Sequence, residues 1–373
     1  MGKPIGIYIH VPFCGKKCPY CDFYSLPFRK PKMEAYLNAL LADIYSYRGK
    51  KISADTLYFG GGTPSLLPPV SIASLIESVK ETFSFSGEAT LEANPNTVTQ
   101  ESLSEYRKAG INRISLGLQS GNDAELQALG RSHSVKQGTA AVFAASAAGF
   151  CNISADIMVG IPYQTKDSLL QTLRFVTGLP VTHISAYLLK TEPETSYWGN
   201  PILQHCPEED QTAALYLEMV SFLEKKGFVQ YEISNFAVPG YAGRHNLKYW
   251  RCQEYLGFGP AAHSFRSGIR FCNPPDLEGY LRSSGSSPII TDSHAGGLSE
   301  QVMLGLHLCE GIPLALLDPI PPERKKAFRE KAVGLERTGF VRLQKERLYL
   351  TTKGFLLSNS VIAELLNELP ETE

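Results

Sequence analysis

Three features that would set the class of this 373-residue chain are almost absent from it. Net charge is one, because 36 Lys and Arg face 37 Asp and Glu, and wrapping a nucleic acid requires a basic surface. The sequence also has no apolar run of the roughly 18–20 residues that span a membrane. The N-terminus lacks the apolar core of a secretory signal and the Ser or Thr at position 6 of a myristoylation signal. We therefore expect a cytoplasmic protein without a membrane span, and we do not expect nucleic acid as its partner.

In a reducing cytoplasm the eight cysteines should not form a disulfide framework. Three of them, Cys14, Cys18 and Cys21, lie within eight residues. The others are scattered, and we expect them to be small buried packing residues. They are Cys151, Cys206, Cys252, Cys272 and Cys309.

Short β-rich runs alternate with helical patterns over the first 236 residues. Such alternation is typical of βα units around a parallel sheet. We predict a partial (β/α)6 barrel of the TIM type, with helices that include residues 134–149 and 207–227. The runs cover residues 6–13, 56–62, 88–95, 113–120, 152–160, 183–190 and 231–236.

The last part of the chain predicts a second, α+β domain. Residues 267–290 are rich in Ser, Gly and Pro and are interpreted as a linker or surface loop. Helices over 299–309 and 322–338, two strands over 339–350 and a final helix resemble a winged-helix domain. The expected boundaries are a barrel over 1–236, an intermediate segment over 237–290 and the second domain over 291–373. Its residues 321–353 hold ten Lys and Arg against four Asp and Glu, which we interpret as a solvated basic face. RNA modification is the alternative that this excess supports.

The clustered cysteines are spaced by three and then two residues, so one compact loop can bring them to one centre. A structural zinc site needs four ligands, and His10 is the candidate for the fourth. Three thiolates instead suit a [4Fe–4S] cluster with one iron left open for a further ligand. The spacing favours the cluster and leaves zinc as the alternative.

The stretch from residue 8 to residue 21 reads Y-x-H-x-P-F-C-x3-C-x-Y-C. It resembles the opening of radical S-adenosylmethionine (SAM) proteins. More narrowly, it resembles the family of oxygen-independent coproporphyrinogen III oxidases and HemW-type haem chaperones, over essentially the whole chain. The resemblance implies a [4Fe–4S] cluster on Cys14, Cys18 and Cys21, with the amino and carboxylate groups of SAM on the open iron.

The same resemblance assigns SAM-binding residues along the barrel. Gly61, Gly62 and Thr63 follow the strand at 56–59 within Gly-Gly-Gly-Thr-Pro, and glycines let a backbone approach a ligand closely. This turn would hold the amino group of SAM. Polar residues near the ends of successive strands are where a barrel builds its site. The further residues assigned to SAM are Tyr8, Tyr20, Glu92, Gln119, Arg131, Asp156 and Ala186.

The resemblance also gives some of these residues separate roles. Arg131 would pair with the carboxylate of SAM through its planar fork. Gln119 and Asp156 would bond the ribose hydroxyls, and the backbone of Ala186 would contact adenine. The rings of Tyr8 and Tyr20 would lie near the sulfonium and adenine.

Two features separate the oxidase branch from the chaperone branch. In the oxidases the third cysteine is followed by Gly and a fourth Cys, whereas here Asp-Phe-Tyr-Ser follows Cys21. The oxidases also carry an N-terminal extension, for which a motif beginning at Tyr8 leaves no room. Both features favour the haem chaperone, and radical decarboxylation of coproporphyrinogen III to protoporphyrinogen IX is the alternative.

Residues 245–250 read His-Asn-Leu-Lys-Tyr-Trp and match the H-N-x-x-Y-W motif of the chaperone branch. His245 offers an imidazole for axial ligation of haem iron, and Tyr249 and Trp250 could pack on the porphyrin. The alternative is a core histidine among aromatic residues. His263 is a second, weaker ligand candidate. The resemblance implies delivery of haem to acceptors such as respiratory haemoproteins.

Overall fold

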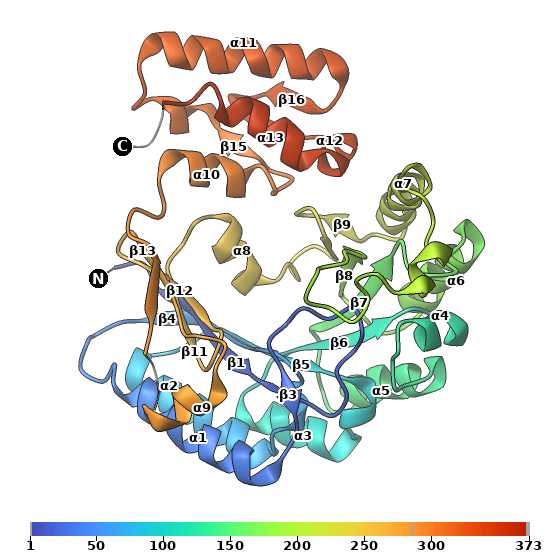
Figure 1. Cartoon of the computed structure of the whole chain (residues 1–373), viewed down its shortest axis with the longest axis vertical. Helices are drawn as coiled ribbons and strands as arrows, with labels where there is room; N and C mark the ends of the chain where they lie inside the picture. The colour runs from blue at the N-terminus through green and yellow to red at the C-terminus, as the bar shows by residue number, and fades with distance from the viewer. Residues whose placement is uncertain (1, 284, 286, 371–373) are drawn as a thin grey trace.

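The computed structural model describes residues 2–283, 285 and 287–370, and it shows a large sheet domain with a smaller C-terminal domain beside it (Figure 1). Six parallel strands form the wall of a partial barrel, in chain order. This confirms the predicted fold class. The strands are β1 (Ile5–Val11), β4 (Ala54–Gly61), β5 (Glu88–Ala93), β6 (Arg113–Gln119), β7 (Ile153–Val159) and β8 (His183–Leu188).

The helices cover the outer face of this sheet (Figure 1). Alternate strand residues such as Ile7 and Ile9 are fully buried against them, while Tyr8 and His10 point to the inside of the barrel. Helix α5 begins at the capping box of Ser134, as its sequence predicts. The helices are α1 (Lys30–Tyr45), α2 (Pro69–Phe83), α3 (Gln100–Ala109), α4 (Asp123–Ala128), α5 (Val135–Ala147), α6 (Lys166–Thr177) and α7 (Glu209–Lys225).

Both edges of the barrel wall are extended by further strands. At β1 the sheet continues through a parallel β11 (Tyr255–Phe258) and the antiparallel β12 (His263–Arg266), β13 (Ile269–Cys272) and β14 (Ile289–Asp292). At β8 it continues through β10 (Asn235–Ala237) and β9 (Val229–Gln230).

Two sequence-based expectations are wrong in this region. The expected linker over 267–290 holds β13, helix α9 (Leu277–Arg282) and the start of β14. Its Ser-Gly pair at 267–268 forms the hairpin turn, with positive φ at both residues. The expected strand over 231–236 is interrupted, and only its last two residues lie in β10. Residues 284 and 286 lie outside the described part of the chain.

The C-terminal domain follows the predicted order of helix, helix, hairpin and helix. Its elements are α10 (Leu298–Gly305), β15 (Ile312–Pro313), α11 (Pro322–Thr338), β16 (Val341–Gln344), β17 (Arg347–Leu350), α12 (Thr352–Leu356) and α13 (Ser358–Leu366). Basic side chains of α11 pair within the domain, as in Arg329 with Glu346 and Lys331 with Glu364. Part of the basic charge of α11 is therefore neutralised by ion pairs within the domain. No helix in the described residues is long and apolar enough to cross a membrane.

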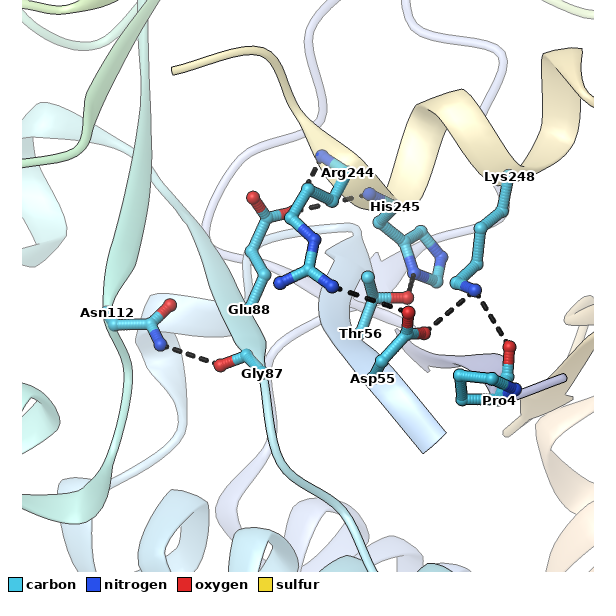
Figure 2. A network of polar contacts seen from close by, with 9 residues as sticks. All are labelled: Pro4, Asp55, Thr56, Gly87, Glu88, Asn112, Arg244, His245 and Lys248. Atoms are coloured by element: carbon cyan, nitrogen blue, oxygen red, sulfur yellow. Dashed lines mark hydrogen bonds and ion pairs between the residues drawn. The ribbon is translucent and has the colours of Figure 1, made fainter. Parts of the chain in front are cut away.

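Helix α8 (Arg244–Trp250) closes the amino end of the barrel (Figure 2). Its first backbone N–H groups, of Arg244 and His245, donate to Glu88 Oε1 at 3.0 and 3.2 Å, where a carboxylate also complements the helix dipole. Lys248 Nζ lies 2.7 Å from Asp55 Oδ1 and donates to the carbonyl of Pro4 at 2.9 Å. These partners stand at or near the starts of β1, β4 and β5, so one short helix ties three strands together.

We expect Lys248→Ala to lower the free energy of unfolding by about 2 kcal/mol. It removes a side chain that is only 6% exposed and leaves Asp55 with the more exposed Arg244 as its remaining cationic partner. Urea denaturation of the cluster-free protein measures the loss. Lys166→Ala, which breaks an exposed pair with Glu218, is the matched control and should cost no more than about 1 kcal/mol. Equal losses in the two variants would contradict the proposed closure.

Candidate cluster and cofactor site

The three clustered cysteines lie on a loop that two short parallel strands hold at the carboxyl end of β1. These strands are β2 (Phe13–Cys14) and β3 (Leu26–Pro27), with Cys14 opposite Pro27. Cys14 is buried, whereas Cys18 and Cys21 are partly exposed. The N–H of Cys21 donates to the carbonyl of Cys18 at 3.1 Å, which turns the loop back on itself. The predicted loop thus presents one buried and two accessible thiols.

The glycine-rich turn after β4 packs directly on the start of this loop. The N–H of Gly62 donates to the carbonyl of Val11, and that of Thr63 to the carbonyl of Phe13, both at 2.8 Å. A Cβ on Gly62 would lie 2.5 Å from the Phe13 oxygen, so no other residue fits without a shift. The hydroxyl of Thr63 then reaches Cys14 Sγ at 3.6 Å. Glycine is required at position 62 because two backbone segments of the barrel touch there, in addition to any contact with a ligand.

Arg131 lies beside the second thiol, on the other side of the loop. Its Nη1 donates to Cys18 Sγ at 3.4 Å and to the hydroxyl of Tyr20 at 3.5 Å. Its Nη2 donates to the carbonyl of Gly117 at 2.8 Å and contacts Asn94 Oδ1. Among the described residues its buried Nε has no hydrogen-bond partner. The unpaired Nε–H can donate a hydrogen bond to an anionic ligand.

Asn94 was not singled out from the sequence, although it follows β5 directly. Its Nδ2 donates to Thr63 Oγ1 at 3.1 Å, and its Oδ1 contacts Arg131. It therefore connects the two residues that lie against Cys14 and Cys18. Its position in the sequence could have indicated this role, because Asn94 directly follows the strand that contains Glu92.

The predicted acidic residues line the inner wall at this end of the barrel. Glu92 accepts from the hydroxyl of Tyr58 at 2.7 Å and from the backbone N–H of Gly61. Burial raises the pKa of Glu92 to about 7 despite these bonds. Asp156 accepts from Ser115 at 3.0 Å, and burial raises its pKa as well. Both carboxyls are thus oriented by neighbouring side chains and can form hydrogen bonds to a ligand inside the barrel.

Gln119 ends β6 with a φ of +67°, a left-handed conformation that costs free energy in a residue other than glycine. A Cβ on Gly117 would lie 3.0 Å from Gln119 Nε2 and 3.2 Å from Arg131 Nη2. Gln119 and Arg131 therefore converge, as expected for one ligand site. The backbone N–H of Ala186 donates to the carbonyl of Ser234 at 2.7 Å, so this N–H is not available to adenine.

His10 connects β1 with the end of the cysteine loop. Its Nε2 donates to the carbonyl of Tyr24 at 2.8 Å, which leaves Nδ1 to accept from the hydroxyl of Tyr8 at 3.1 Å. Among the described residues, no group of three or more His, Cys, Asp or Glu is close enough to hold a single metal ion. The donor set that the loop presents, three thiols, suits a [4Fe–4S] cluster with one open iron.

His245 lies away from the cysteine loop, inside α8 at the amino end of the barrel. It is 1% exposed. Its ring nitrogens pair with Thr56 Oγ1 at 2.9 Å and with the Tyr249 hydroxyl at 2.7 Å, and burial lowers its pKa to about 3. In this conformation neither nitrogen is open to an iron, contrary to the expectation of an accessible imidazole.

The aromatic residues of the same motif point in different directions. Trp250 stacks on His307 of the C-terminal part, with ring centroids 4.8 Å apart, and bonds the buried carboxyl of Glu232. Tyr249 instead lines a cavity of about 480 Å³ beside the cysteine loop. Other residues of its wall are Tyr8, His10, Phe23, Tyr24 and His263. Of the motif's three predicted haem contacts, only Tyr249 reaches this cavity.

Comparison with known proteins finds matches over most of the chain. Residues 8–176 match the radical SAM superfamily and residues 293–357 match the HemN C-terminal domain. The haem chaperone HemW of Lactococcus lactis is 32% identical over 98% of each chain. That of Bacillus subtilis is 33% identical over 97% of this chain and 99% of its own. Coproporphyrinogen III oxidase (HemN) of Escherichia coli has a similar fold, with a TM-score of 0.80 and 22% identity, over 98% of this chain and 91% of its own.

We expect the pKa of Glu92 to make stability depend on pH. Because its folded pKa of about 7 exceeds the ordinary 4.5, the bound proton stabilises the fold at low pH, and this stabilisation is lost as pH rises through 7. Glu92→Gln should therefore gain about 1–3 kcal/mol relative to the unsubstituted protein between about pH 5 and pH 8. Urea denaturation at both pH values measures the gain.

The exposed Glu209→Gln is the control and should show no gain with pH. A constant difference between Glu92→Gln and the unsubstituted protein would contradict the assignment.

Proposed function

The chain belongs to the HemW haem chaperone family of radical SAM proteins, and from this membership we propose that it binds a [4Fe–4S] cluster, SAM and haem and delivers haem to acceptor proteins. The observation that carries the proposal is the loop of Cys14, Cys18 and Cys21, with Thr63 against the first thiol and Arg131 against the second. We further propose that the chain acts in the cytoplasm and that its acceptors include respiratory haemoproteins.

The chain's own residues would hold the cluster and SAM as follows. When bound, the cluster supplies an open iron for SAM and, on reduction, an electron. Arg131, whose buried Nε lacks a partner among the described residues, would take the carboxylate of SAM. The turn at Gly61–Thr63 and the carboxyl of Glu92 would take its amino group. Gln119 and Asp156 would bond the ribose from neighbouring strands.

The aromatic side chains near the loop would exclude water from these ligands. Tyr20 packs edge-on against Tyr197, with centroids 6.2 Å apart. The ring of Tyr8 stacks on that of Tyr58 inside the barrel, with centroids 6.2 Å apart and an angle of 27° between the planes. Such rings present apolar faces to a sulfonium or an adenine.

In the haem part of the proposal, the H-N-x-x-Y-W motif contributes to the ligand mainly through Tyr249. His245 would act behind it, because its ring nitrogen and the Tyr249 hydroxyl are 2.7 Å apart. Trp250 would act by joining α8 to the C-terminal domain through the stack on His307.

We expect the replacement of Cys14, Cys18 and Cys21 by Ala to abolish the broad visible absorption of the cluster after anaerobic reconstitution, because no thiolate remains in the loop. Iron and sulfide contents measured on the same samples should fall with it. Replacement of Cys151, Cys206 and Cys309 by Ala is the control and should leave both unchanged. Survival of the absorption without the loop thiols would overturn the cluster assignment.

An anaerobic assay with coproporphyrinogen III, SAM and a reductant separates the chaperone from an oxidase. For a chaperone we expect no carbon dioxide and no 5′-deoxyadenosine in amounts that depend on the porphyrinogen. The same reconstituted sample should bind haem in an absorbance titration. Catalytic, substrate-dependent amounts of both products would establish the oxidase instead.

A further inference from the structure

The cavity beside the cysteine loop has a wall of aromatic rings that also carries polar side chains, among them Asp22, His10 and His263. Its volume of about 480 Å³ is in the ordinary range for small-molecule sites. Aromatic rings line it from separate elements: Tyr8 from β1, Phe23 and Tyr24 from the loop, and Tyr249 from α8. Phe23 is 59% exposed, a large apolar ring left uncovered at the cavity. Covering such a ring is favourable for any apolar ligand.

Two side chains of the cavity wall that could ligate iron make no hydrogen bond among the described residues. They are the carboxyl of Asp22 and the imidazole of His263, and of the two an imidazole is the more usual ligand of haem iron. His10 uses both ring nitrogens, and the hydroxyls of Tyr8, Tyr24 and Tyr249 pair with His10, the Leu277 N–H and His245. In the part of the chain that the structure describes, the imidazole of His263 makes no hydrogen bond or ion pair. An exposed imidazole on the wall of an aromatic cavity is free to take a metal of the ligand.

The backbone around His263 is held firmly, although its side chain is free. His263 begins β12, directly opposite Cys272 of β13. The preceding turn is tied by Asn273, whose Nδ2 donates to the carbonyl of Gly259 at 2.9 Å. A Cβ on Gly259 would lie 2.6 Å from the carbonyl oxygen of His10, so the turn touches β1. The backbone of His263 therefore stands at a fixed place relative to β1, and the imidazole can turn about it.

We propose that the haem iron is bound by His263 in this aromatic cavity, with the macrocycle against Phe23, Tyr24 and Tyr249. The inference rests on the proposed haem chaperone function and names its binding site. It assigns the iron to a histidine outside the H-N-x-x-Y-W motif, because His245 is 1% exposed and has both nitrogens paired. The exposure of Phe23 and His263 leaves one side of the ligand open to an acceptor.

The test is a titration of the full-length, reconstituted protein with haemin, followed by the Soret absorbance. Removing groups that merely support a metal ligand costs about 10–100-fold in affinity, so His263→Ala should weaken binding by at least about tenfold and shift the Soret band. Added imidazole should restore the band. His205→Ala, at an exposed histidine outside the cavity, is the matched control and should behave as the unsubstituted protein.

Metal-free protoporphyrin IX separates ligation from packing. His263→Ala should bind protoporphyrin IX as the unsubstituted protein does, because this porphyrin has no iron to coordinate. Phe23→Ala should weaken the binding of both haemin and protoporphyrin IX. An unchanged haemin titration for His263→Ala, or equal losses for haemin and protoporphyrin IX, would overturn the assignment to His263. Failure of the unsubstituted protein to bind haemin would overturn the proposed function itself.

Discussion

The contact on which the site depends is the packing of the glycine turn after β4 on the end of β1. Two backbone hydrogen bonds of 2.8 Å, from Gly62 to Val11 and from Thr63 to Phe13, fix it. No side chain fits between Gly62 and the Phe13 carbonyl. Because Cys14 follows Phe13, this contact sets where the cysteine loop leaves the barrel. Arg131 and Glu92 then act on a loop whose first thiol is already placed.

The barrel separates its two ends by chemistry. At the carboxyl end, thiols, a guanidinium and carboxyls with raised pKa values lie partly open. At the amino end, polar side chains are paired with one another and buried, as His183 is with Ser154 and Tyr231. Buried polar groups that are paired in this way help to specify one structure and leave little for a ligand. Barrel enzymes keep the same division between the functional and the supporting end.

Sequence patterns predicted the fold and the cysteine loop well, but they did not predict which residues distant in sequence contact one another. Alternation of βα units and the spacing of Cys14, Cys18 and Cys21 are local signals, and the structure has the corresponding elements. The linker prediction failed because Ser and Gly mark hairpin turns as well as free loops. Asn94 was missed, and the buried alternative for His245 was not preferred, because both depend on partners distant in sequence, Arg131 and Thr56.

Helix α8 is seven residues long and touches both parts of the molecule. His245 and Lys248 engage the barrel, while Trp250 stacks on His307 just beyond α10. The H-N-x-x-Y-W pattern therefore describes a joint between the barrel and the C-terminal domain. The contacts of α8 with these two parts determine which residues the pattern holds. Of the pattern, only Tyr249 lines the cavity, so the rest of the cavity wall could change with the cargo while this pattern stays intact. As a diagnostic in genome sequences, the motif reports the architecture of the joint more directly than the identity of the cargo.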